Sequence, residues 1–124
     1  MERYLEMKEK IAEAVKANLQ DAIALNDDLA DHPELSGEEY ESSRKIVELL
    51  KHKGFDVEYP FAGLPTSFKA TYGRNDHKYK VAIMTEYDAL PGIGHACGHC
   101  VSGAISVLAG IAAVQLQEVP RVKM

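Results

Sequence analysis

Residues 79–99 have the sequence YKVAIMTEYDALPGIGHACGH, in which an apolar run leads into a turn rich in glycine and proline. Residues 79–85 are apolar on both faces toward their end, as in a strand that is covered on both sides of its sheet. An apolar strand followed by a loop with polar side chains is a common way for an α/β protein to build a site. The sequence therefore predicts a central strand over residues 79–85 and a loop over residues 86–98.

Two amphipathic helices are predicted before this strand. Residues 5–30 place apolar side chains three and four positions apart, which is the spacing of one helical face. Pro33 ends this helix, because the residue before a proline is driven out of the α region. A second helix follows Ser36, which forms a capping-box pattern with Glu39, and Gly54 ends that helix. The apolar stripe of the first helix consists of Ile11, Val15, Leu19, Ala22, Ile23 and Leu29.

The remaining segments complete an α/β pattern. Residues 56–59 and 67–72 alternate in polarity and predict two further strands. A last helix over residues 100–117 is apolar nearly all round, which predicts an interior position. Residues 119–124 have the pattern of another strand that is cut off, so the domain is expected to be truncated. The order of elements predicts an α/β fold with helices on the faces of a sheet.

Composition narrows the classes of function. The chain has 124 residues and a formal net charge of −5, and its acidic residues are concentrated in the first half, which argues against a nucleic-acid surface. No apolar run approaches the ~20 residues of a membrane span, and the N-terminus lacks the basic and apolar pattern of a signal peptide. We therefore expect no membrane partner, a cytoplasmic location and reduced cysteines.

The loop contains side chains that bind metals. His95, Cys97 and His99 alternate along it, and an extended backbone would place all three on one side. Glu86 and Asp88 end the preceding strand and could add oxygen ligands or orient a histidine. The residues alone also allow an activated Cys–His nucleophile or a structural cluster. With Cys100, Cys97 forms a C-x-x-C pattern, which is typical of thiol redox proteins.

Several motifs together resemble the zinc-dependent aminoacylase/carboxypeptidase superfamily. The similarity is greatest to its amidohydrolase branch, which includes the indole-acetyl-amino-acid hydrolases and p-aminobenzoyl-glutamate hydrolase. The motifs are HPELS (32–36) with EEY (38–40), GFDV (54–57), GLPT (63–66) and EYDALPGIGHACGH (86–99). The resemblance implies that residues 1–124 are the N-terminal portion of a single mixed-sheet, helix-flanked, metallopeptidase-like catalytic domain.

The resemblance also implies roles for individual residues. Cys97 and His99 correspond to metal ligands of the family, and Asp88 to the residue that orients the metal site. Glu86 stands where more distant relatives place a histidine ligand, and His95 belongs to the signature without an assigned ligand role. Cys100 replaces the aspartate or asparagine that is usual in relatives.

The implied reaction is hydrolysis of the amide bond of an N-acyl amino acid, aminobenzoyl-glutamate or a small dipeptide. Two divalent ions, zinc or manganese, would polarise the carbonyl and activate a water. The family's general-base glutamate, its remaining ligands and its lid and dimerisation domain are expected beyond residue 124, so the chain is expected to be inactive alone. Two alternatives are a non-catalytic module that oligomerises through the apolar helix 100–117 and a thiol redox protein that uses Cys97 and Cys100.

Overall fold

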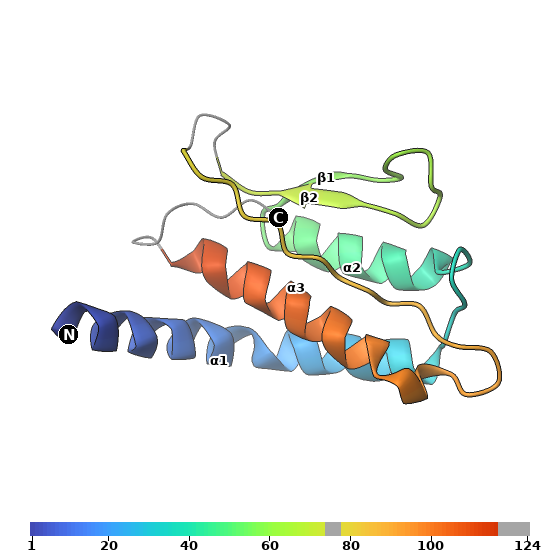
Figure 1. Cartoon of the computed structure of the whole chain (residues 1–124), viewed down its shortest axis with the longest axis horizontal. Coiled ribbons are helices and arrows are strands. Elements are labelled where there is room, and N and C mark those ends of the chain that lie inside the picture. Colours follow the sequence, from blue (N-terminus) through green and yellow to red (C-terminus); the bar gives the residue numbers. More distant parts are fainter. Residues whose placement is uncertain (74–77, 117–124) are drawn as a thin grey trace.

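The computed structural model describes residues 1–73 and 78–116 and has a mixed α/β architecture. Within these residues three α-helices are formed by Glu2–Asp31 (α1), Tyr40–His52 (α2) and His99–Gln115 (α3). Two short strands, Asp56–Glu58 (β1) and Lys69–Thr71 (β2), precede a 3₁₀ turn at His95–Cys97 (η1). Figure 1 shows α1 and α3 side by side, and α2 contacts both α3 and β1. The predicted α/β class is confirmed.

α1 forms where the sequence predicts it, and its buried face overlaps the predicted stripe in part, since Ala22 and Leu29 are buried as predicted. The face that packs on the rest of the protein consists of Asn18, Ala22, Leu25 and Leu29. Ile11, Leu19 and Ile23, which belong to the predicted stripe, are exposed instead. The cause is the position of α3, which lies along the Asn18 side of α1 and leaves the neighbouring apolar side chains uncovered.

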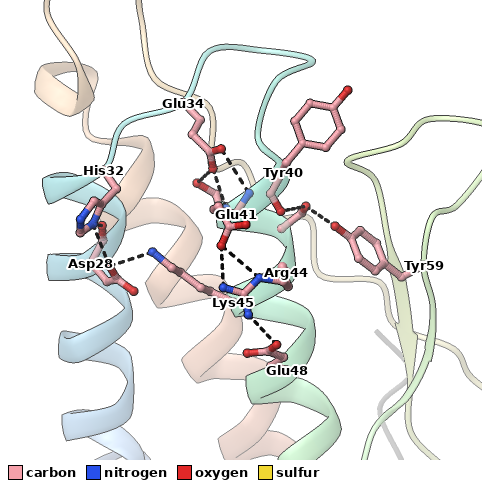
Figure 2. Close-up of polar contacts among 11 residues, drawn as sticks. Asp28, His32, Glu34, Tyr40, Glu41, Arg44, Lys45, Glu48 and Tyr59 are labelled. Atoms are coloured by element: carbon pink, nitrogen blue, oxygen red, sulfur yellow. Dashed lines mark hydrogen bonds and ion pairs between the residues drawn. The ribbon is translucent and has the colours of Figure 1, made fainter.

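α2 begins later than predicted. Its first residue is Tyr40, and neither Ser36 nor Glu39 caps it through a side-chain hydrogen bond. The carboxylate of Glu34 does so from outside the helix, by accepting hydrogen bonds from the main-chain N–H groups of Glu41 and Ser42 (Figure 2). An acceptor that precedes the helix by several residues leaves no capping-box signature, which explains the error.

The end of α2 agrees with the prediction. Gly54 adopts a left-handed conformation with φ +92°, and its N–H donates to the carbonyl of Lys51. The next N–H, of Phe55, donates to the carbonyl of Leu50 at 3.0 Å. These bonds satisfy carbonyl groups of the last helical turn and direct the chain into β1.

The sheet is smaller than predicted. β1 and β2 are antiparallel, with Val57 opposite Ala70 in the centre of the register. Residues 79–85 form no strand in the described part of the chain, and residues 82–85 line an apolar cavity of about 390 Å³ that β2 and α3 also border. A central strand needs hydrogen-bonded partners on both sides, and the described residues supply no such ladder. Residues 119–124, predicted to begin another strand, lie outside the described residues.

The core lies where α3 meets α1, α2 and the sheet. Its fully buried members include Leu29, Ile46, Leu50, Val107 and Ile111. α3 is only partly interior, contrary to the prediction, because Val101 and Ile105 are 47% and 60% exposed. None of the helices in the described residues is long and apolar enough to cross a membrane.

Candidate metal centre

Glycines shape the loop that carries the candidate ligands. Leu90 and Gly94 exchange main-chain hydrogen bonds of 3.0 and 3.1 Å, which close a tight turn. The chain then enters η1, and Gly98, with φ +88°, redirects it into α3. The backbone between residues 95 and 99 is therefore not extended, so the extended loop from which the alternation of His95, Cys97 and His99 was argued is not observed.

His99 is held by Asp88 at the first residue of α3. Its Nδ1 lies 2.9 Å from the Asp88 carboxylate and 2.9 Å from the main-chain carbonyl oxygen of Asp88. The other ring nitrogen, Nε2, lies 3.5 Å from the carboxylate of Glu86. These contacts engage Nδ1 with Asp88 and direct Nε2 toward Glu86, so Nε2 is the nitrogen at which a further ligand would have to bind.

The groups around the Asp88–His99 pair favour the charged form of the His99 imidazole. The hydrogen bond to the Asp88 carbonyl raises the pKa of His99, partial desolvation opposes it, and the negative charges of Asp88 and Glu86 raise it further. A proton and a divalent cation would therefore compete for the imidazole of His99, because a ligating imidazole must be neutral.

His95 lies close to this pair without joining it. Both of its ring nitrogens are buried and have no hydrogen-bond partner among the described residues. Burial lowers the pKa of His95, the positive charge of His99 lowers it further, and Asp88 acts in the opposite direction. An imidazole whose two nitrogens are both buried and unsatisfied is unusual and marks a place where another polar group or an ion could be accommodated.

The two cysteines have opposite environments. Both are free thiols, and Cys97 is exposed at the surface of η1 whereas Cys100 is 5% exposed and packs in the core. Cys100 thus occupies an apolar position in α3 and not the loop cleft.

A polar pocket of about 220 Å³ opens beside the pair. It is lined by Ser36, Glu39, Thr85, Glu86, Tyr87 and Asp88. Tyr87 forms one wall; its hydroxyl donates to the main-chain carbonyl of Thr66, and burial together with the charge of Glu39 raises its pKa to about 12. The Thr66 hydroxyl donates to Glu39 at 2.7 Å. The residue pattern indicated only a capping role for Glu39, so its position in this wall was not predicted.

The candidate donors suit a divalent ion in chemistry but not in arrangement. Thiolate, imidazole and carboxylate are the ligands that zinc prefers, and Asp88 on Nδ1 resembles the carboxylate–histidine pairs of zinc sites. However, the described residues contain no group of three or more His, Cys, Asp and Glu side chains placed to hold an ion. The structure therefore brings Glu86, Asp88 and His99 together but assembles no complete coordination sphere in the described part of the chain.

Comparison with known proteins identifies relatives. No protein-family model matches the chain. The chain is 31% identical over 119 residues to a p-aminobenzoyl-glutamate hydrolase chain of Escherichia coli (strain K12), covering 82% of this chain and 24% of that protein. It is 30% identical to the Xaa-Arg dipeptidase of Mus musculus, covering 85% of this chain and 26% of that protein. It is 31% identical to thermostable carboxypeptidase 2 of Saccharolobus solfataricus, covering 77% of this chain and 28% of that protein.

These relatives are all hydrolases by name, and they agree with the family that the sequence motifs resemble. The chain spans about a quarter of the length of the relatives it matches. Its match to them extends over most of its own residues, which include the loop with Asp88, Cys97 and His99. The chain belongs to the amidohydrolase branch of the aminoacylase/carboxypeptidase superfamily.

Proposed function

We propose that this chain forms part of a metal-dependent hydrolase that cleaves the amide bond of N-acyl amino acids, aminobenzoyl-glutamate or small dipeptides. The observation that carries the proposal is the Asp88–His99 pair, in which the carboxylate engages Nδ1 and leaves Nε2 for a further ligand. The names of the relatives, which include a p-aminobenzoyl-glutamate hydrolase, a dipeptidase and a carboxypeptidase, support the substrate class.

Cys97 and His99 are the proposed protein ligands of a divalent ion, zinc or manganese. Asp88 would fix the orientation and tautomer of the His99 imidazole, as carboxylates that hydrogen-bond a metal-binding histidine usually do. A catalytic zinc ordinarily has three protein ligands, and the described residues supply no such set. We therefore propose that the chain alone holds a partial site and does not turn substrate over.

Metal content tests this proposal. Elemental mass spectrometry on the purified chain is expected to show zinc or manganese below one equivalent, and Cys97→Ala is expected to lose it. Cys100→Ala is the matched control, because it removes a thiol from the core and not from the loop. Equal metal content in all three proteins would contradict the assignment of Cys97.

Activity provides an independent test. The chain is expected not to hydrolyse p-aminobenzoyl-glutamate or N-acetyl amino acids, with or without added zinc or manganese. Hydrolysis that disappears on Cys97→Ala or with a chelator would overturn the inactivity proposal and would show that self-association completes the site.

A second candidate function is a non-catalytic module that associates through an apolar face. An apolar groove of about 210 Å³ lies between α1 and α3, and its walls include the exposed Leu19, Ile23, Val101 and Ile105. Apolar side chains gathered in one groove are typical of an interaction surface. Light scattering at high micromolar concentration is expected to show a dimer or larger species that Ile105→Lys dissociates, and a monomeric wild-type chain would exclude this function.

A further inference from the structure

The segment of residues 33–36 lies between the N-terminus of α2 and the candidate site. One contact with the site is made by the main chain: the carbonyl oxygen of Glu34 accepts a hydrogen bond of 2.7 Å from the N–H of Ala89. Leu35 and Ala89 form an isolated parallel bridge at the same point. Ala89 directly follows Asp88 and is buried, so this bond fixes the backbone next to the carboxylate that holds His99.

The side chain of the same residue points the other way, to α2. The Glu34 carboxylate accepts bonds of 2.6 Å from both the N–H and the hydroxyl of Ser42, and one of 3.2 Å from the N–H of Glu41 (Figure 2). The two main-chain donors are N–H groups of the first turn of the helix, where a negative charge is favoured by the helix dipole. The carboxylate therefore anchors residues 33–36 to the start of α2.

A second contact joins this segment to the far side of the loop. Gly94 has φ +58°, and a Cβ atom at this position would lie 3.6 Å from Cγ of Pro33. The ring of Pro33 therefore packs over the turn that Leu90 and Gly94 close. Together with the Glu34–Ala89 bond, the segment contacts the loop on both sides of its turn.

We propose that Glu34 is a positioning residue for the Asp88–His99 pair, because its carboxylate anchors residues 33–36 to α2 while its main-chain carbonyl holds Ala89. The proposal goes beyond the assigned ligands, and its relevance to catalysis rests on the proposed function of His99. The competing interpretation is that Glu34 is only a helix cap, whose loss would weaken α2 without affecting Ala89 specifically.

Hydrogen exchange at the Ala89 amide, measured by NMR, separates the two interpretations. The Glu34→Ala substitution is expected to accelerate exchange of the Ala89 N–H by a factor at least about tenfold larger than the factor for the core amide of Val107. Glu34→Gln is expected to lie between this variant and the wild type, because one side-chain oxygen remains to accept from Ser42. If Ala89 and Val107 accelerate by the same factor, the positioning proposal is wrong and Glu34 is only a cap.

Glu41→Gln is the matched control. It removes a carboxylate from the same helical turn, but this side chain bonds Arg44 and not residues 33–36. Protection of Ala89 is expected to remain within about twofold of the wild type, because the Glu41 N–H still donates to Glu34. Should Glu34→Ala fail to fold, the contrast between Glu34→Gln and Glu41→Gln decides: equal exchange at Ala89 in the two variants overturns the proposal.

Zinc titration by calorimetry distinguishes failure of this proposal from failure of the proposed function. If the wild type binds zinc, Glu34→Ala is expected to bind it more weakly while Glu41→Gln does not, and unchanged affinity in Glu34→Ala would overturn a role in the site. If the wild type binds neither zinc nor manganese, the proposed partial metal site fails, whereas specific exposure of Ala89 in Glu34→Ala would still support the positioning of Asp88.

Discussion

The side chain of Asn18 in α1 donates a 2.7 Å hydrogen bond to the side-chain oxygen of Gln115, the last residue of α3. The amide of Gln115 returns a longer bond of 3.3 Å to Asn18. Asn18 is buried although it is polar, and this pairing, with a second bond to the carbonyl of Ala14, satisfies its amide group. The face of α1 that contains Asn18 is thus the face toward α3.

A matched pair of leucine substitutions tests which face of α1 is buried. Leu29 is 1% exposed and Leu19 is 39% exposed. Leu29→Ala is expected to lower the free energy of unfolding by about 2–5 kcal/mol, the usual cost of a cavity in a core. Leu19→Ala is expected to cost less than about 1.5 kcal/mol. Urea unfolding followed by circular dichroism measures both, and equal losses would contradict the observed packing.

The contribution of Glu34 to stability is expected to depend on pH. Desolvation tends to raise the pKa of Glu34, but the bonds from Ser42 and Glu41 and the charge of Lys45 outweigh it and place the pKa below its ordinary value of 4.5. A carboxylate with a lowered pKa stabilises the folded state above its unfolded pKa and loses this effect as the pH falls through the folded value. Glu34→Gln is therefore expected to cost about 1 kcal/mol at pH 7 and progressively less below pH 4.5. Urea titrations at pH 7, 5 and 3 provide the comparison, and a difference that is constant with pH would speak against the ionised cap.

Any side chain at Gly103 in α3 is expected to destabilise the protein. A Cβ atom there would lie 2.5 Å from the main-chain oxygen of Glu86, and the Thr85 hydroxyl already donates to the carbonyl of Gly103 at 3.2 Å. Alanine favours a helix by about 1 kcal/mol over glycine. Gly103→Ala is nevertheless expected to destabilise the protein by about 1–3 kcal/mol, because residues 85 and 86 must move away.

Ser102→Ala is the control for Gly103, since Ser102 is the preceding residue on the exposed side of α3. Thermal unfolding of both variants is the measurement, and the control is expected to match or slightly exceed the wild type. A stabilised Gly103→Ala would show that the close approach of Glu86 to α3 does not occur in solution.

The two thiols are expected to differ in reactivity. Cys97 is exposed and Cys100 is buried in the core, so a thiol-specific reagent should modify one thiol in the native protein and both in denaturant. Absorbance of the released chromophore counts the thiols, and Cys97→Ala should abolish the native reaction. A reversible Cys97–Cys100 disulfide in a glutathione titration would instead support the redox alternative.

Much of the helical structure could be predicted from local signals. The end of α2 at Gly54 follows from the freedom of glycine at positive φ, and the end of α1 follows from the restriction that Pro33 imposes. The face of α1 was predicted only in part: Ala22 and Leu29 are buried as expected, but the position of α3 decides that Asn18 is buried and its neighbour Leu19 is not. The strand predicted at residues 79–85 is not observed for a similar reason. A strand forms only where neighbouring strands hydrogen-bond to it, and the local sequence does not specify those neighbours.

The sequence predicts which residues are candidate ligands but not how the structure arranges them. The motif in residues 86–99 predicts the donor residues, and the loop is observed where the pattern of glycine and proline indicates. The relative placement of Cys97 and His99 depends on the left-handed turn at Gly98, which alternation of residue types cannot reveal. Glu34 holds Ala89 through its main-chain carbonyl, and because every residue has such a carbonyl, this contact leaves no signature in the sequence.

The turn at Gly98 has a mechanical consequence for the proposed ligands. Cys97 belongs to η1 and His99 to α3, and the one residue between them has φ +88°, which other residues rarely adopt. An ion held by both side chains would therefore link η1 to the first residue of α3 across Gly98. Binding of the ion would restrict the motion of residues 95–98 relative to α3. Backbone NMR relaxation of these residues would therefore show whether the ion is bound, without any measurement of activity.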